Sequence, residues 1–383
     1  MDKNLRIYVH IPYCAHKCHY CDFNSHVRKQ IDWDGWLAAV SAELRYRATE
    51  QRPVASVFIG GGTPSLAPAA TIASLLQCMR DTLPLLDDAE ITMEANPGTA
   101  DAGRFYGYHA AGVNRLSIGV QSLHNEELRW LERIHDADQA KQAFSLARSA
   151  GFDNINLDLM YALPSQSWQQ WQASLQQAIA LQPDHLSCYQ LTVEVNTRLA
   201  VMHANNPDMD WPEESLACRF FQSTRELLAA AGYAAYEISN YARAGHHCRH
   251  NDGYWRYDDY IGIGPGAAGK HDTNDGGVYR YSNMRSPEKY IEQATQTGHA
   301  VADDEQLTAA EAAREAFWLG LRRQQGVEHA PYRARFGDSL LQQQRHACRK
   351  WQANGNIIDD EQHTAIHDQG WLLADEIAAS VFE

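Results

Sequence analysis

The stretch YVHIPYCAHKCHYCDFNSH, residues 8–26, runs from a strand-like segment into a loop that holds three cysteines. Cys14, Cys18 and Cys21 follow the spacing C-x3-C-x2-C. A structural zinc site usually has four protein ligands, and disulfides need cysteines in pairs. Three cysteines in one short loop therefore indicate a metal group that leaves one ligand position open.

Composition and charge limit the classes of protein to consider. The chain has 383 residues, of which 44% are hydrophobic and 21% charged, which is typical of a soluble protein with one large and one smaller domain. No apolar run approaches the ~20 residues of a membrane span. The N-terminus leads straight into a strand, so we expect no signal peptide and a cytoplasmic protein. Eight cysteines then indicate a reducing compartment, and the net charge of −15 argues against nucleic acid as a partner.

Short apolar runs alternate with longer amphipathic stretches along the first half of the chain. The predicted strands are LRIYVHI (5–11), SVFIGG (56–61), EITMEA (90–95), RLSIGV (115–120), INLDLMY (155–161) and HLSCYQL (185–191). Between them, the segments 33–48, 69–83 and 137–151 have helical periodicity. Alternating strands and helices predict parallel strands joined by right-handed crossovers. We therefore expect an α/β fold, a partial (β/α)6 barrel of the TIM type.

Polar or glycine-rich sequence follows the predicted strands where they end. The cysteine loop follows the first strand, GGGTPS the second, and Glu94 and Gln121 lie at the ends of the third and fourth. Asp158 lies within the fifth. The C-terminal ends of barrel strands share one face, and that face carries the chemistry in β/α barrels. These residues are therefore predicted to form one site.

Three thiolates can bind three irons of a [4Fe–4S] cluster and leave the fourth iron open to a small molecule, since thiolate is the usual cluster ligand. The alternative is a zinc knuckle completed by His10, His16, His19 or His26. The aromatic Tyr20 between the second and third cysteines argues against zinc.

The cysteine motif with its aromatic residue resembles the radical SAM superfamily. The longer string YVHIPYCAHKCHYCDF, followed by GGGTPS, resembles one branch of it, the oxygen-independent coproporphyrinogen III oxidases and their relatives, the HemW heme chaperones. The resemblance covers nearly the whole chain. It implies that the open iron chelates S-adenosylmethionine (SAM), which a reduced cluster can cleave to a deoxyadenosyl radical.

The same resemblance implies roles for individual residues. Tyr8 would lie beside the cluster with its SAM, Gly61, Gly62 and Thr63 would approach the amino-acid end of SAM, and Glu94 would accept hydrogen bonds from the ribose. The positions that match contacts to a second SAM in the oxidases are Gln121, Arg133 and Asp158, with Tyr20 nearby. Without the resemblance, Arg133 would be interpreted as a charge on a surface helix, whereas a carboxylate inside the strand of Asp158 needs buried partners.

The sequence departs from the oxidase pattern in three places. Phe23 stands where the oxidases have a fourth cysteine, and little sequence precedes the first strand. The third departure is HNDGYW (250–255), which resembles the heme-binding signature of the HemW chaperones. These differences favour a heme chaperone that passes heme to acceptor hemoproteins, with contact to the membrane surface left open. The alternative is radical decarboxylation of coproporphyrinogen III.

The segment AGHHCRHNDGYWRY supports heme on chemical grounds as well. Imidazole is a common axial ligand of heme iron, and aromatic rings such as Tyr254 and Trp255 offer flat surfaces to a porphyrin. His250 is the preferred ligand and Cys248 its rival. A transition-metal site or a plain polar loop are the other interpretations of this segment.

The pattern changes near residue 300. We expect a radical SAM domain over 1–300 and a small C-terminal domain over 301–383, with helices followed by a hairpin in a winged-helix-like arrangement. Winged helices often bind DNA, but residues 305–383 contain 8 Arg and Lys against 12 Asp and Glu, a balance of −4 that disfavours DNA. A radical SAM enzyme that modifies tRNA is disfavoured by the overall charge for the same reason.

Overall fold

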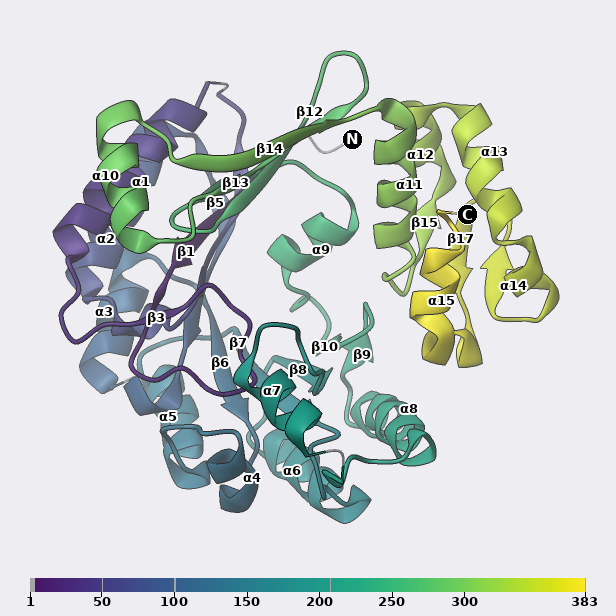
Figure 1. Cartoon of the computed structure of the whole chain (residues 1–383), viewed down its shortest axis with the longest axis horizontal. Helices are drawn as coiled ribbons and strands as arrows, with labels where there is room; N and C mark the ends of the chain where they lie inside the picture. Colours follow the sequence, from purple (N-terminus) through teal and green to yellow (C-terminus); the bar gives the residue numbers. More distant parts are fainter. Residues whose placement is uncertain (1–3, 50, 100, 207, 383) are drawn as a thin grey trace.

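The centre of the molecule is a curved sheet whose middle strands run parallel (Figure 1). The computed structural model describes residues 4–49, 51–99, 101–206 and 208–382. The six strands expected from the sequence are adjacent in chain order: β1 (Leu5–Ile11), β4 (Val54–Gly61), β5 (Leu85–Ala95), β6 (Arg115–Gln121), β7 (Ile155–Tyr161) and β8 (His185–Gln190). The predicted α/β partial barrel is thereby confirmed.

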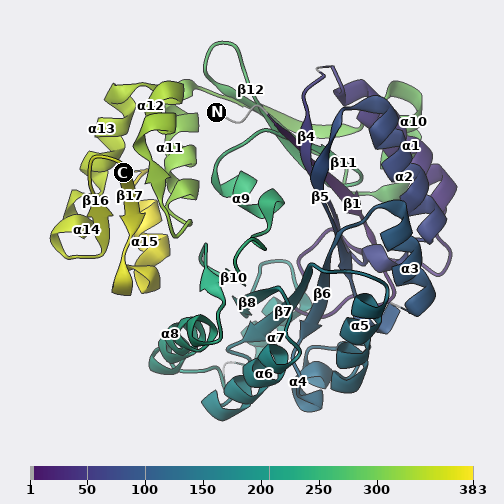
Figure 2. The same cartoon turned by 180° about the vertical axis from the view of Figure 1, so that it is seen from behind.

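Helices cover the convex face of this sheet (Figure 2). The crossover helices are α1 (Trp33–Arg47), α2 (Ala69–Thr82), α3 (Ala102–Ala111), α4 (Asn125–Trp130), α5 (Ala137–Ser149) and α6 (Trp168–Ala180). Their beginnings are set locally. Capping boxes start α5 at Asp136 with Gln139 and α6 at Ser167 with Gln170, which satisfies backbone N–H groups that have no partner inside a helix.

Alternate residues of each strand face opposite sides of the sheet. The outward residues, such as Ile7, Val57 and Leu157, are apolar and fully buried against the helices. The inward residues are mostly polar, although parallel strands are usually apolar on both faces. Arg6, Tyr8 and His10 of β1 pair with Ser56, Phe58 and Gly60 of β4, and similar sets continue around the sheet to His185, Ser187 and Tyr189 of β8. The barrel interior is therefore a polar space.

The sheet continues beyond the predicted strands at both edges. The strand β11 (Tyr260–Ile263) pairs in parallel with the free side of β1, and β12 (Ala268–Asp272), β13 (Val278–Asn283) and β14 (Val301–Leu307) follow it antiparallel. At the other edge, β10 (Asn240–Ala242) and β9 (Ala234–Ala235) extend β8 after the helices α7 (Arg198–Asn205) and α8 (Glu214–Ala230). The helix α10 (Pro287–Thr297) lies against α1. The sheet thus includes β14, which lies just beyond the predicted domain boundary at residue 300.

The C-terminal part has its own hydrophobic core. Its helices are α11 (Ala309–Gly320), α12 (His329–Phe336), α13 (Asp338–Ala347), α14 (Arg349–Ala353) and α15 (Ala374–Ala379), and its strands are β15 (Val327–Glu328), β16 (Ile357–Asp359) and β17 (His363–Ile366). The β16–β17 hairpin follows the helices as predicted, and β15 adds a third strand to it.

The short helix α9 (Arg249–Trp255) lies between the curved sheet and the C-terminal part (Figures 1 and 2). It packs on β4 on one side and on α11 on the other. On the second side, Arg323 donates to Asp252 at 2.9 Å, and the Arg322 guanidinium lies 5.0 Å from the centre of the Trp255 ring. The helix therefore connects the barrel interior with the C-terminal part.

Candidate functional site

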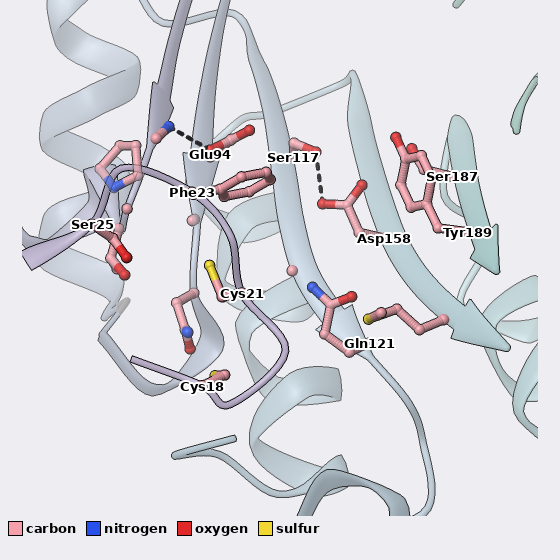
Figure 3. A pocket seen from close by; sticks show the side chains of 18 of the residues that line it. Cys18, Cys21, Phe23, Ser25, Glu94, Ser117, Gln121, Asp158, Ser187 and Tyr189 are labelled. Carbon is pink, nitrogen blue, oxygen red and sulfur yellow. Dashed lines mark hydrogen bonds between the residues drawn. The ribbon is translucent and has the colours of Figure 1, made fainter. Parts of the chain in front are cut away.

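One cavity of about 780 Å³ lies inside the barrel. Every site residue predicted from the sequence lines it: Tyr8, Cys14, Cys18, Tyr20, Cys21, Gly61, Gly62, Thr63, Glu94, Gln121, Arg133, Asp158 and His250. Figure 3 shows part of this lining, with Glu94, Gln121 and Asp158 on neighbouring strands and the cysteine loop beside them. Segments more than 240 residues apart in the chain, at Tyr8 and His250, thus meet in one space.

The cavity has two ends with different chemistry. We call the region of Cys14, Cys18, Cys21 and residues 61–63 the cysteine end; it lies where the parallel strands finish. We call the region of Arg115, Cys248, His250 and Tyr254 the α9 end; it lies toward the starts of β4 and β6.

The three cysteines of the loop are free thiols with donors beside them. Cys14 lies in β2 (Tyr13–Cys14), which pairs with β3 (His26–Val27), and the hydroxyl of Thr63 donates to its sulfur at 3.4 Å. Arg133 Nη1 is 3.9 Å from the Cys18 sulfur. Burial raises the pKa of the Cys14 thiol, and the bond from Thr63 opposes that rise. Donors aimed at sulfur stabilise bound thiolates and suit a cluster ligand.

A single zinc ion requires its ligands to converge within about 2.3 Å of one point. Among the residues that the structure describes, no group of three or more His, Cys, Asp or Glu side chains is gathered in this way. A [4Fe–4S] cluster binds each thiolate at a different iron, so its ligands stand around a larger body. The loop offers three free thiols, one for each of three irons of such a cluster.

The cysteine loop itself requires glycine at the end of β4, at Gly61, and at the next position, Gly62. Gly61 has a φ of +123°, and a Cβ on Gly62 would lie 2.6 Å from the Tyr13 carbonyl oxygen and 3.0 Å from the Cys14 sulfur. The N–H groups of Gly62 and Thr63 donate to Ile11 and Tyr13, both at 2.8 Å. The resemblance implies that these glycines approach SAM. The structure shows a second role: because they have no side chains, they leave room for β2, the strand that contains Cys14.

Glu94 ends β5 and accepts a hydrogen bond from the Gly61 N–H at 3.0 Å. Burial, and then the nearby Asp158, raise the pKa of Glu94 to about 8. Burial also raises the pKa of Tyr8, with a smaller contribution from Glu94, and the Tyr8 hydroxyl shares a hydrogen bond with His10 at 2.9 Å. Glu94 lines the cavity, so its carboxyl oxygens can accept hydrogen bonds from hydroxyl groups there as well as from Gly61.

Asp158 has the buried partners that its position in β7 requires. Its carboxylate accepts from Asn156 at 2.7 Å. It also accepts from Ser117 at 3.0 Å (Figure 3). Asn156 in turn accepts from Ser187 at 3.1 Å. Burial nevertheless raises the pKa of Asp158. The strands β6, β7 and β8 are thus joined across the interior by one polar network.

Arg133 is part of the site and is not the surface helix charge of the alternative interpretation. It follows α4 in a turn, and its Nη2 donates to the Gly119 carbonyl at 2.8 Å. Its Nε is buried without a partner among the described residues. Gln121 has a φ of 67°, a costly conformation for a residue with a side chain, which is typical of functional sites. Tyr20 lies in the lining and packs against the cluster of Leu131, Leu163, Leu191 and Leu199.

His250 reaches the α9 end of the cavity with both ring nitrogens engaged. Nδ1 shares a hydrogen bond with Ser56 at 3.0 Å, and Nε2 shares one with the Tyr254 hydroxyl at 2.9 Å. Its side chain is 1% exposed, and burial, followed by Arg6 and Arg115, lowers its pKa to about 3. Cys248 is buried too, which raises the pKa of its thiol to about 12. Either group must be released before it can bind iron.

Two charged residues at this end were not predicted. Glu90 accepts from the N–H groups of Arg249 and His250 at 3.0 and 3.1 Å and thereby caps the start of α9. Arg115, the first residue of β6, is 2% exposed and lines the cavity. Their signal in the sequence was the alternation of polar and apolar residues within EITMEA and RLSIGV, which indicates a polar barrel interior.

Among the described residues, no helix is both long enough and apolar enough to cross a lipid bilayer.

Two family models match the chain. The radical SAM superfamily matches residues 8–178, and the HemN C-terminal domain matches residues 307–373. The two matches correspond to the parallel barrel and to the C-terminal part.

Curated relatives match over most of their length. The chain is 46% identical over 291 residues to the heme chaperone HemW of Escherichia coli, covering 75% of this chain and 76% of that protein. It is 33% identical over 383 residues to the mitochondrial radical S-adenosyl methionine domain-containing protein 1 of Danio rerio, covering 98% of this chain and 86% of that protein. Among solved structures, coproporphyrinogen III oxidase (HemN) of Escherichia coli matches with a TM-score of 0.83 at 24% identity, over 99% of this chain and 90% of that one. That structure shares the fold.

Proposed function

The chain belongs to the radical SAM superfamily and to the family of the heme chaperone HemW, and we propose that it binds heme and delivers it to acceptor hemoproteins. The observation that supports this most is the cavity that contains both the cysteine loop and the HNDGYW helix α9. A protein that handles heme beside a cluster needs such a shared space.

The proposal includes a [4Fe–4S] cluster held by Cys14, Cys18 and Cys21. The donors from Thr63 and Arg133 toward two of these sulfurs support it. When bound, the cluster and SAM would supply radical chemistry, for which the protein provides placement and electrostatics. The proposal that the chain binds heme does not depend on whether this radical chemistry takes place.

We assign SAM to the cysteine end of the cavity. Glu94 would receive the ribose hydroxyls, and residues 61–63 would face the amino-acid end beside Tyr8. Gln121, Arg133, Asp158 and Tyr20 would contact a second SAM. The unpartnered Nε of Arg133 and the strained backbone of Gln121 support a ligand at this place.

We assign heme to the α9 end, with His250 as the iron ligand and Cys248 as its rival. Ligation requires His250 to exchange its bond with Tyr254 or Ser56 for the iron. Losing one such buried bond costs about 1–3 kcal/mol, so this chain would hold heme less firmly than a protein with a free histidine. Looser binding suits a protein that must give its heme away.

Acceptors would be hemoproteins reached from the cytoplasm, at the membrane surface where the acceptor is a membrane protein. Nucleic acid stays disfavoured by the net charge of −15.

The test is a hemin titration of anaerobically reconstituted protein, run in parallel with an assay for coproporphyrinogen III turnover. We expect stoichiometric heme binding without turnover. His250→Ala should change the Soret band, Cys248→Ala should not, and Cys14→Ala should still bind heme. Thermal stability is measured on the same samples. If His250 has only a structural role, His250→Ala should lower the thermal stability and leave the Soret band unchanged. Turnover that requires Cys14 and ignores His250 would assign the chain to the oxidases instead.

A further inference from the structure

Within the described part of the chain, Arg115 is a buried cation without a direct partner. Its side chain is 2% exposed and lines the α9 end of the cavity. Its Nε atom is buried and has no hydrogen-bond partner among the described residues. Burying a charge without a partner costs several kcal/mol, so a site that keeps one needs a compensating group.

The other Arg and Lys residues that are buried as whole residues in the described part of the chain each form an ion pair. Arg6 lies 2.9 Å from Asp258, Lys270 lies 3.0 Å from Asp259, and Arg323 lies 2.9 Å from Asp252. Arg115 forms no such ion pair with any described residue, although Glu90 and Asp158 are near enough to stabilise its charge at a distance. The described residues therefore leave the place of a direct partner open.

The two acidic residues near Arg115 already accept hydrogen bonds from other groups. Glu90 accepts from the N–H groups at the start of α9, and its Oε1 is also 3.5 Å from the Cys248 sulfur. Asp158 accepts from Asn156 and Ser117. Neither carboxylate can turn to Arg115 without breaking these bonds, so the guanidinium keeps its donors for a ligand.

The side chains around Arg115 indicate which chemical group the ligand carries. A guanidinium is a planar fork that matches a carboxylate with two parallel hydrogen bonds. The aromatic rings of Tyr8, Phe58 and Tyr254 line the same cavity, and the Phe58 and Tyr254 rings lie 5.3 and 4.9 Å from the His250 ring at this end. The ligand group is thus a carboxylate carried by a flat, largely apolar molecule.

We propose that Arg115 binds a carboxylate of the small molecule that occupies the α9 end of the cavity. The carboxylate has two candidate sources, a propionate of heme or the amino-acid carboxylate of a SAM molecule. Both ligands belong to the proposed function, on which this inference therefore rests. A SAM chelated by the cluster would have its carboxylate at the cysteine end. A second SAM would extend from there along Asp158, whose charge acts on Arg115, so it is the SAM whose carboxylate can reach Arg115.

The experiment compares hemin with hemin dimethyl ester, which lacks free carboxylates, and measures SAM binding separately by equilibrium dialysis. If a propionate is the source, the wild type should bind hemin about 10- to 100-fold more tightly than the ester. Arg115→Met should abolish that preference, and Arg115→Lys, which keeps the charge but loses the fork, should keep part of it. If SAM is the source, Arg115→Met should lower the number of SAM molecules bound and leave the hemin preference unchanged.

Lys270→Met is the matched control, since it removes a buried cation whose partners are Asp259 and Asp272 and which is not part of the cavity lining. It should lower thermal stability without altering the hemin-to-ester ratio or the SAM stoichiometry. Circular dichroism checks folding, and Arg115→Lys serves as the test where Arg115→Met does not fold. Unchanged ratio and unchanged SAM stoichiometry in a folded Arg115 variant would overturn the inference. Absence of hemin binding by the wild type would refute the proposed function alone, because the SAM measurement still tests Arg115.

Discussion

The two ends of the cavity use polar groups in opposite ways. At the cysteine end, groups are left available: three free thiols, the buried Nε of Arg133 and the strained Gln121. At the α9 end, His250 has both ring nitrogens bonded, and Glu90 is used to cap α9. The first end is organised to receive a ligand. At the second end Arg115 is left available as well, but His250 must exchange protein bonds for a ligand bond. We infer that ligand affinity at the cysteine end depends on how the protein groups are placed. At the α9 end it depends on competition between the ligand and the hydrogen bonds that His250 makes within the protein.

The strongest test of an open cysteine end is Cys14→Ala. Each thiolate holds one iron, so the loss of one ligand should abolish the broad thiolate-to-iron absorption after anaerobic reconstitution. Iron and sulfide content and the visible spectrum measure this. Cys78→Ala is the control, because Cys78 is a free thiol on α2 outside the cavity and should leave the spectrum intact. One zinc and no iron in protein purified without air would contradict the cluster.

The second test removes an acceptor at the same end. Glu94→Ala should weaken SAM binding about 5- to 150-fold, the equivalent of about 1–3 kcal/mol for lost ribose hydrogen bonds. Isothermal titration of the reconstituted protein measures the affinity, and cluster absorption should stay unchanged. Glu288→Ala, which alters an exposed carboxylate paired with Arg28, is the control. An unaltered SAM affinity would remove Glu94 from the site.

The third test uses the raised pKa of Glu94. Its folded pKa of about 8 lies above the value near 4.5 of an exposed glutamate, so the native state holds a proton that the unfolded chain releases. The stabilisation from this proton is complete below pH 4.5 and is lost as the pH rises through about 8. Chemical denaturation of ligand-free protein at pH 6 and pH 9 should show a smaller decline in the free energy of unfolding for Glu94→Gln than for the wild type. Equal declines would mean that Glu94 is already ionised in the native protein at pH 6.

The smallest expected effect sharpens the idea of competition at the α9 end. Tyr254→Phe removes the hydroxyl that holds His250 Nε2 and keeps the ring. If binding must break this bond, the substitution should tighten hemin binding by about 1 kcal/mol, or about fivefold. Tyr260→Phe is the control, because Tyr260 contacts the Tyr254 ring but not the imidazole. Weaker hemin binding in Tyr254→Phe would mean that the hydroxyl helps to place the ligand.

The sequence predicted the parallel barrel closely because its strands carry a local signal. The strands at 5–11 and 155–161 coincide with their predicted ranges, and the polar residues that follow the strands meet in one cavity. The strand β11 was not predicted. It has four residues, and its pairing with β1 joins positions about 250 residues apart, which no local pattern encodes.

The α9 end was predicted only in part, for a different reason. HNDGYW identified His250 by resemblance, but the partners Ser56 and Tyr254 of its two nitrogens follow from side-chain packing. Arg115 and Glu90 begin segments that were recognised as strands from their apolar residues alone. The inward-facing residues of these strands do indicate Arg115 and Glu90, because a polar residue at every second position of a parallel strand is unusual.

The position of α9 also links the cavity to the far side of the molecule. Asp252, two residues after His250, is held by Arg323 beyond α11, and Trp255 lies under Arg322. A ligand that draws His250 from its place therefore works against these contacts as well. Thermodynamic reciprocity then applies: a protein that docks on the C-terminal part and loosens Arg323 would change the affinity for the ligand by the same factor by which the ligand changes the affinity for that protein. The contact between Asp252 and Arg323 would make release of the cargo depend on arrival of its recipient.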